Sequence, residues 1–277
     1  MISCHLNGGL GNQLFQIFAT ISYATQHGEL FVFLKKDFYG NRNGYWDSFF
    51  KPLQLFTTEG LPDKMSFRRE QHYHYNEIPP QKYQKQDIYL HGYYQSYRYF
   101  EKNYEMICRL IRLEQQKKNL VKRYPNYISY RNMTSLHFRL GDYLSLSECH
   151  PVLSVEYYDK SIQKMMDLTE NHKLHFLYFC QKEDNTSVQA TVKLLQNKYP
   201  TCVFEKASDD ASDWEQMLMM SCCRHHIIAN SSFSWWGAYF NTSVDKIVCY
   251  PERWFGPKLL SQSTRDLCPN TWHNIVE

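Results

Sequence analysis

Apolar runs of strand length alternate with amphipathic segments of helix length through the second half of this 277-residue chain. The strand-like runs include SLHFR at 135–139, LHFLYF at 174–179 and HIIA at 226–229. The segments between them carry apolar residues at helical spacing, and Ser212 with Glu215 has the spacing of a capping box. Strands that alternate with helices predict a mostly parallel, doubly wound sheet, so we expect an α/β fold.

The first half of the chain shows similar elements less regularly. A strand at residues 1–5 precedes the glycine-rich loop NGGLGNQ, and the helix after that loop is expected to end at Gly28. Further buried strands are expected at 30–34 and 88–94.

The length of the chain is comfortable for two domains of ordinary size. The polar stretch 113–127 separates the two halves, so we expect one domain over residues 1–130 and another over residues 131–277. The irregular, aromatic-rich stretch 37–85 is expected to form loops and short helices on an acceptor-facing surface.

Composition narrows the class of protein. Hydrophobic residues make up 43% of the chain and the net charge is +3, so we expect a packed core and no nucleic-acid partner. None of the nine cysteines forms a paired C-x-x-C arrangement, which argues against a zinc site and favours free thiols in a reducing compartment. The start of the chain, MISCHLNGG, has no basic segment and no long apolar stretch, so we expect neither a signal peptide nor a membrane anchor. We expect a cytoplasmic protein, with peripheral association at the inner membrane face left open.

The loop GGLGNQ is the first of three strand exits that carry polar residues, and ligands of parallel sheets bind at such exits. Its glycines would let the backbone approach an anion at a helix N-terminus. No Walker loop is present, and a dinucleotide fingerprint is not matched either, because Gly9 and Gly11 fit but Leu14 takes the third glycine position. A tight structural turn is the alternative interpretation.

The second exit is NSS, which follows the apolar run IIA. Asn230, Ser231 and Ser232 stand where the next helix is expected to begin. Hydroxyl groups and unbonded N–H groups together suit phosphate oxygens, and ordinary helix capping is the alternative.

The third exit is LHFRLGDY, at residues 136–143. The planar guanidinium of Arg139 suits a diphosphate, and it would counter the charge that develops on a diphosphate leaving group. Asp142 would orient Arg139, bind a substrate hydroxyl or act as a base; a structural Arg–Asp pair is the alternative. His137 should face away from Leu136, as a satisfied structural histidine more often than as a ligand.

Four segments together resemble the inverting fucosyltransferases of glycosyltransferase family 11, the alpha-1,2-fucosyltransferases. They occur in the order of the family and span most of the chain: GGLGNQ at 8–13, GYYQSYRYF at 92–100, HFRLGDY at 137–143 and IIANSSFSWWGAYFN at 227–241. The resemblance implies a GT-B-like architecture, in which two Rossmann-like domains face a central cleft. The first domain would be the acceptor side, and the second would bind the donor GDP-L-fucose.

The reaction implied by this resemblance is transfer of L-fucose to the 2-hydroxyl of a terminal galactose, with inversion. The acceptor would be a galactose-terminated oligosaccharide or a lipid-linked glycan, and no metal or other cofactor would be required. The sequence names neither the acceptor nor the oligomeric state.

Site residues carry over from the family's motifs. Arg139 would bind the donor pyrophosphate, Ser231–Ser234 would make further donor contacts, and Asn12 would lie near the reaction centre. We therefore assign catalysis to Arg139, Asp142 and Asn12, no residue to a metal, and substrate binding to Gly9, Gly11, Gln13, His137, Asn230, Ser231, Ser232, Phe233 and Ser234.

The sequence departs from the family pattern at two places. A second arginine often follows the first, and here the position holds Leu140. A strand that often ends in Ser-Asp-Asp reads FCQKED here, with Glu183 and Asp184 nearby. The catalytic base is also open: Asp142 is the first choice and Asp47 an alternative.

Three rival functions remain at this point. They are a transferase that uses another nucleotide-sugar donor, an NAD-type oxidoreductase and a glycan-binding protein with a decayed site. The missing third glycine counts against the oxidoreductase. Retention of both Arg139 and NSSFS counts against the decayed site.

Overall fold

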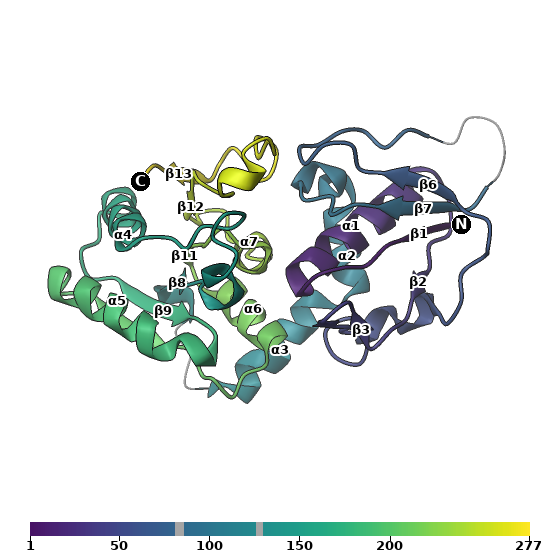
Figure 1. Ribbon diagram of the computed structural model, residues 1–277. Helices are drawn as coiled ribbons and strands as arrows, with labels where there is room; N and C mark the ends of the chain where they lie inside the picture. The colour runs from purple at the N-terminus through teal and green to yellow at the C-terminus, as the bar shows by residue number, and fades with distance from the viewer. Residues whose placement is uncertain (81–85, 126–129) are drawn as a thin grey trace. The chain divides into compact units, whose positions relative to one another are not determined.

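The computed structural model describes residues 1–80, 86–125 and 130–277. The chain forms two compact units: unit 1 is Met1–Gln116 with Gln262–Pro269, and unit 2 is Lys117–Ser261 with Asn270–Glu277. Each unit combines helices with parallel strands (Figure 1). The expected α/β class is therefore confirmed, with the pair of α/β units that a GT-B-like fold has.

The units divide at residues 116/117 and not at the expected 130/131. The helix α3 (Leu113–Arg123) crosses this point, and its residues from Lys117 onward belong to unit 2, where Arg123 Nη1 lies 2.7 Å from the buried Glu215 carboxylate. Specific pairing of this kind, which a polar composition does not reveal, fixes the boundary. Residues 126 and 127 of the stretch 113–127, which was expected to separate the domains, lie outside the described residues.

A later segment, Gln262–Pro269, returns to unit 1. Ser96 Oγ donates a 2.6 Å hydrogen bond to the carbonyl of Asp266, and Arg98 lies 3.1 Å from the carboxylate of the same residue. Unit 1 is therefore built from two separate parts of the chain.

Unit 2 contains a six-stranded, wholly parallel sheet in the order β10-β9-β8-β11-β12-β13. The strands are β8 (Met133–His137), β9 (His175–Phe179), β10 (Val203–Lys206), β11 (His225–Ile227), β12 (Val248–Pro251) and β13 (His273–Ile275). This is the strand order of a Rossmann sheet, and the order reverses between β8 and β11. Ligands of such sheets bind outside the carboxyl ends of the strands at this reversal.

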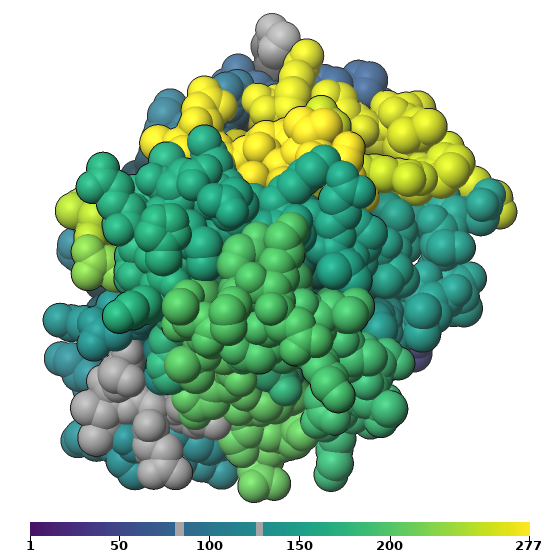
Figure 2. Space-filling model, turned by 90° about the vertical axis from the view of Figure 1, so that its left-hand side faces the viewer, coloured from purple at the N-terminus to yellow at the C-terminus, as the bar shows by residue number. Residues whose placement is uncertain are grey.

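Helices cover both faces of this sheet, as a doubly wound fold requires. The helices α4 (Val155–Thr169) and α5 (Asn185–Lys198) lie on one face, and α6 (Asp213–Cys222) and α7 (Ser232–Tyr239) lie on the other (Figure 1). On the side shown in Figure 2, α4 and α5 form much of the outer surface below the yellow C-terminal segment.

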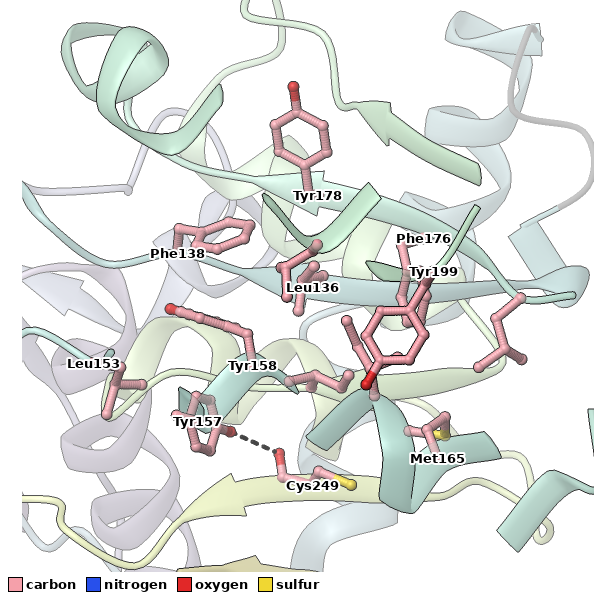
Figure 3. Close-up of a cluster of buried hydrophobic side chains, with 14 of the residues drawn as sticks. Leu136, Phe138, Leu153, Tyr157, Tyr158, Met165, Phe176, Tyr178, Tyr199 and Cys249 are labelled. Atoms are coloured by element: carbon pink, nitrogen blue, oxygen red, sulfur yellow. Dashed lines mark hydrogen bonds between the residues drawn. The ribbon is translucent and has the colours of Figure 1, made fainter. Parts of the chain in front are cut away.

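A cluster of buried side chains fills the space between the sheet and the pair α4 and α5. Leu136 of β8 and Phe176 of β9 contribute to it from the sheet, and Tyr157 and Met165 contribute from α4 (Figure 3). His137 does not belong to this cluster, because alternate residues of a strand point to opposite faces.

Two predicted helix starts are confirmed in unit 2. Ser154 Oγ accepts the N–H of Tyr157 at the start of α4. Ser212 and Glu215 form the expected capping box at the start of α6.

Unit 1 contains a three-stranded parallel sheet in the order β1-β7-β6, made of β1 (Ile2–Cys4), β7 (Ile88–His91) and β6 (Ser66–Arg69). The helix α1 (Leu10–Gln26) follows β1 and is mostly buried. It begins earlier than its apolar spacing predicts, so Gly11, Asn12 and Gln13 lie in its first turns and not in a loop. Gly28, at φ +63°, ends it as expected.

The remaining elements of unit 1 are short. The strand expected at 30–34 is reduced to β2 (Phe33–Leu34), which pairs with β5 (Thr57–Thr58), and β3 (Phe38–Tyr39) pairs with β4 (Arg42–Asn43). The strand expected at 88–94 stops at His91. Two 3-10 turns then lead to α2 (Tyr104–Leu110). Residues 81–85 of the expected acceptor-facing stretch lie outside the described residues.

Within the described ranges, no helix has both the length and the apolar character that crossing a membrane requires.

Leu136→Ala should lower the free energy of unfolding of unit 2 by about 2–5 kcal/mol, because Leu136 is fully buried between the sheet and α4. Leu194→Ala is the matched control: Leu194 on α5 is 57% exposed, and its loss should change stability by about 0.5 kcal/mol or less. Urea denaturation followed by circular dichroism measures both. Equal losses for the two variants would contradict the assignment of the core.

Candidate functional site

Arg139 lies two residues beyond β8, at the reversal of the strand order in unit 2. Its Nη2 donates to Asp142 Oδ1 at 2.5 Å and its Nη1 to Gln181 Oε1 at 3.2 Å. Its guanidinium carbon lies 5.0 Å from the ring centroid of Tyr143, within the range of a cation–π contact. Arg139 Nε is buried and has no protein partner. The Arg–Asp pair considered from the sequence is present, and it orients the guanidinium.

The turn after Arg139 is held by residues from the end of β9. Gly141 has φ +44°, and its N–H donates to Asp184 Oδ2 at 2.9 Å. This positive φ favours glycine, and a Cβ added to Gly141 would also lie 2.0 Å from Gln181 Oε1 and displace that side chain. The segment FCQKED, which departs from the family pattern, therefore supplies two supports for the turn that carries Arg139. Glu183, between them, is exposed.

The segment after β11 starts α7. Ser231 Oγ accepts the N–H of Phe233 at 3.3 Å, so the helix-capping interpretation is confirmed for this serine. Ser234 is buried, and its Oγ accepts the N–H of Ala229 at 3.2 Å. Ser232 and Phe233 are half-buried. The four residues Ser231–Ser234 thus form the first turn of a helix that begins at the strand exit.

Asn230 is 1% exposed at the same exit. Its Nδ2 donates to the carbonyls of Pro151 and Trp254, at 2.9 and 3.2 Å, while its Oδ1 is buried and has no protein partner. The backbone carbonyl of Asn230 accepts the hydroxyl of Tyr143 at 3.0 Å. Tyr143 therefore joins the exits of β8 and β11. We assigned no role to Tyr143 from the sequence. Its position in the segment LGDY, directly after Asp142, could have indicated one.

His137 is buried against α7, with its ring centroid 5.6 Å from that of Phe233. Its Nδ1 is buried and has no protein partner, so it is not the satisfied histidine we expected. Burial, assisted by the nearby charge of Arg139, lowers the pKa of His137 to about 3. The ring is therefore neutral at neutral pH.

Three buried polar atoms without a protein partner thus lie at the exits of two neighbouring strands. They are His137 Nδ1 and Arg139 Nε after β8, and Asn230 Oδ1 after β11. Buried polar groups in proteins are almost always hydrogen-bonded. The set therefore suits a polar ligand that offers both hydrogen-bond acceptors and donors.

The predicted residues of unit 1 form a second group, at the start of α1. Gly9 caps the helix, and Gly11 is buried within it. Gln13 is fully buried, and its Nε2 donates to the carbonyls of Gly8 and Asn43, at 2.9 and 2.8 Å, so it holds the loop in place. Asn12 is half-buried, and its Oδ1 accepts a 2.9 Å hydrogen bond from Gln95.

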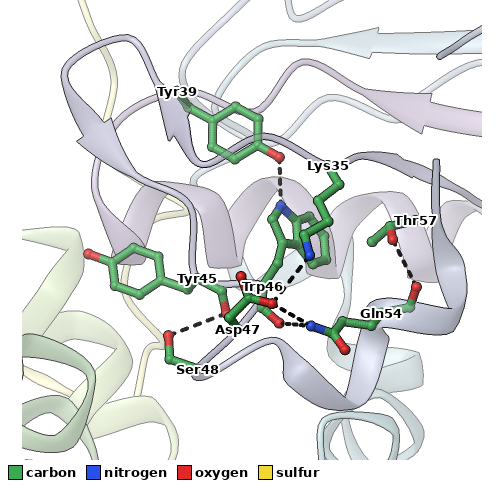
Figure 4. Close-up of polar contacts among 8 residues, drawn as sticks. All are labelled: Lys35, Tyr39, Tyr45, Trp46, Asp47, Ser48, Gln54 and Thr57. Atoms are coloured by element: carbon green, nitrogen blue, oxygen red, sulfur yellow. Dashed lines mark hydrogen bonds and ion pairs between the residues drawn. The ribbon is translucent and has the colours of Figure 1, made fainter. Parts of the chain in front are cut away.

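Asp47, the alternative base, lies in a surface network of unit 1 (Figure 4). Its carboxylate is 3.2 Å from Lys35 Nζ and accepts a 2.7 Å hydrogen bond from Gln54. Its side chain is 74% exposed. Both carboxylates considered as the base, Asp47 and Asp142, therefore lie in ion pairs.

The sequence model of glycosyl transferase family 11 matches residues 61–272, which is most of the chain. The chain belongs to this family. The match includes the segments that carry Gln95, Arg139 and Asn230.

Two curated relatives from Escherichia coli align with about two thirds of the chain. One is the O-antigen biosynthesis glycosyltransferase WbnK, 32% identical over 194 residues, which are 67% of this chain and 60% of the relative. The other is an alpha-1,2-colitosyltransferase, 31% identical over 196 residues, which are 66% of this chain and 61% of the relative. The chain thus spans about three fifths of the length of these relatives.

Solved structures of glycosyltransferases show more distant similarity. Fucosyltransferase NodZ from Bradyrhizobium is matched with a TM-score of 0.48 and 13% identity, over 86% of this chain and 92% of that one. Escherichia coli ADP-heptose lipopolysaccharide heptosyltransferase II is matched with a TM-score of 0.37 and 13% identity, over 58% of this chain and 43% of that one.

The unfolding free energy should fall as the pH falls from 6.5 towards 3, with His137 contributing about 1.4 kcal/mol per pH unit. The sign follows because the pKa of His137 is lowered in the folded state, so the unfolded chain binds the proton first. His137→Gln should make the dependence shallower by that amount, as measured by urea denaturation from pH 7 to pH 4. Identical slopes for the two proteins would contradict a buried, neutral His137.

Proposed function

We propose that this protein is an inverting alpha-1,2-fucosyltransferase, which moves L-fucose from GDP-L-fucose to the 2-hydroxyl of a terminal galactose in a glycan. The observation that carries the proposal is Arg139, held at the strand-order reversal of unit 2 with a buried Nε that has no protein partner. Membership of glycosyl transferase family 11 supports the reaction class. The name of the colitosyltransferase relative supports the linkage and a fucose-like sugar.

The donor diphosphate would lie against Arg139 and the first turn of α7. Arg139 supplies a fixed positive charge and a fork of N–H groups, and the backbone N–H groups at the start of α7 point toward the same edge of the sheet. In the transfer step, the galactose 2-hydroxyl oxygen forms a bond to the anomeric carbon as the bond from that carbon to the diphosphate oxygen breaks. Negative charge then develops on GDP, and Arg139 stabilises it most at that point.

The proton of the galactose hydroxyl needs an acceptor. Asp142 remains our first choice for this acceptor. Its carboxylate would have a second role as well, because it orients Arg139 through the 2.5 Å ion pair. Departure of a negatively charged GDP would draw Arg139 toward the phosphate and free Asp142 to accept a proton.

A colitose donor is the second candidate, because a relative 31% identical to this chain is named as an alpha-1,2-colitosyltransferase. The galactose would be part of an oligosaccharide or of a lipid-linked glycan, the latter reached by peripheral contact with the inner membrane face.

Arg139→Ala should reduce acceptor-stimulated GDP release from GDP-fucose by about 100- to 1,000-fold, because it removes the charge that meets the leaving group. The assay measures GDP release with and without lactose, beside a parallel assay with nucleotide-activated colitose. Arg131→Ala, which removes an exposed arginine just before β8, is the matched control and should keep full activity. Near-normal turnover by the Arg139 variant would rule out the pyrophosphate assignment.

Transfer should continue at an unchanged rate in EDTA, because Arg139 and the start of α7 take the role that a divalent metal has in other transferases. The rate is compared with and without EDTA, and then with added Mg²⁺ or Mn²⁺. Strict dependence on an added divalent ion would contradict the metal-free mechanism.

A further inference from the structure

The segment GYYQSYRYF was part of the resemblance but received no role in the site. It follows β7, and β7 pairs in parallel with β1, whose own exit leads to Asn12. Neighbouring parallel strands end at the same edge of a sheet, so the two segments meet there.

Gln95 makes the direct contact between these exits. Its Nε2 donates to Asn12 Oδ1 at 2.9 Å, and its Oε1 accepts a hydrogen bond from the hydroxyl of Tyr73. Gln95 is 8% exposed, and both ends of its amide are bonded within the protein. The amide of Asn12 is thereby turned with its oxygen toward Gln95.

The opposite atom of that amide, Asn12 Nδ2, lies against Gly8. A Cβ added to Gly8 would be 2.4 Å from Asn12 Nδ2, and Gly8 itself has φ +80°. The chain from Tyr73 through Gln95 to Asn12 therefore fixes an N–H donor beside the glycine-rich turn.

The backbone that carries Gln95 is unusually well anchored. The Glu70 carboxylate accepts the N–H groups of Tyr93 and Tyr94, at 2.7 and 3.0 Å, and Tyr94 has φ +53°. Gln16 Nε2 donates to the carbonyl of Gly92 at 3.1 Å. On the other side of Gln95, Ser96 Oγ is bonded to the carbonyl of Asp266.

Close packing reinforces these bonds, because a Cβ at Gly92 would lie 2.4 Å from the Cβ of Glu70. Gln95 is thus held by a turn whose backbone is bonded before and after it. Anchoring of this kind is what a group needs if it is to orient a reacting neighbour to within a fraction of an ångström.

We propose that Gln95 is a positioning residue for Asn12, with Tyr73 fixing the direction of the Gln95 amide, so that Asn12 presents Nδ2 as a hydrogen-bond donor to the acceptor sugar. This inference rests on the proposed function, which places Asn12 near the reaction centre. Gln95 itself does not touch the substrate and acts through Asn12.

Gln95→Glu tests the direction of the amide. Glutamate has the size of glutamine and keeps an oxygen for Tyr73, but it offers Asn12 a second acceptor in place of a donor. The Asn12 amide should turn over, so that its oxygen lies where its nitrogen was. With GDP-fucose and lactose, we expect kcat to fall about 10- to 100-fold, the cost of a misplaced group near the reaction.

The dissociation constant for GDP, measured by calorimetry, should not change, because GDP is bound by unit 2. Gln116→Leu is the matched control: Gln116 of unit 1 also makes two hydrogen bonds, to the carbonyls of Phe49 and Ile111. It should lose stability and keep its kcat. A purely structural role for Gln95 would make the two variants behave alike.

A double-mutant cycle with Asn12→Ala asks whether Gln95 acts through Asn12. The Gln95→Glu change should cost nothing further once Asn12 is alanine. If instead the two losses multiply, or Gln95→Glu keeps the wild-type kcat, the positioning role is wrong.

Tyr73→Phe is the alternative test variant if Gln95→Glu fails to fold, because it removes only the hydroxyl that bonds to Gln95 and leaves the ring. We expect a several-fold fall in kcat with GDP affinity intact, and an unchanged kcat would overturn the inference. Wild-type protein that binds GDP without transferring fucose to lactose or to any other galactoside would overturn the proposed function, and the inference with it. These outcomes are distinct, since only the last concerns the wild type.

Discussion

Parallel pairing of β8 with β9 on one side and β11 on the other determines the geometry of unit 2. The register sets His137 beside Phe179 and Leu136 beside Ile227, so the three strands end at one edge of the sheet. Their following segments then bond to one another, through Gly141 to Asp184 and through Tyr143 to Asn230. A shift of β8 by one residue would turn Leu136 out of the core and break both bonds. The packing of the core therefore also fixes the position of Arg139.

Periodic patterns in the sequence predicted the layers of unit 2, because they depend on near neighbours in the chain. The alternation of strand and helix, the caps at Ser154 and Ser212, and the location of Arg139 at a strand exit are of this kind. The contacts that hold the turn after Arg139 do not depend on near neighbours in the chain. Asp184 reaches Gly141 across 43 residues and Tyr143 reaches Asn230 across 87, and no local pattern reports such contacts.

Unit 1 was predicted less well for a related physical reason. The expected strand at 88–94 ends at His91, and the carboxylate of Glu70 takes the N–H groups of Tyr93 and Tyr94 that a continuing strand would give to a neighbour. α1 begins at Leu10 because Gly9 caps it, a position that its apolar residues do not mark. The expectation of phosphate binding came from residue chemistry, whereas fucose, galactose and the linkage came from the family resemblance, and all of these stay proposals.

The return of residues 262–269 to unit 1 has a consequence for synthesis on the ribosome. Ser96 and Arg98 bond to Asp266, which is made only after most of unit 2 has been synthesised. Domains generally fold as units while the chain is being made, in order from the N-terminus. Unit 1 can therefore complete its contacts to Asp266 only late in synthesis, so its last step of folding follows the synthesis of strands β8 to β12 of unit 2.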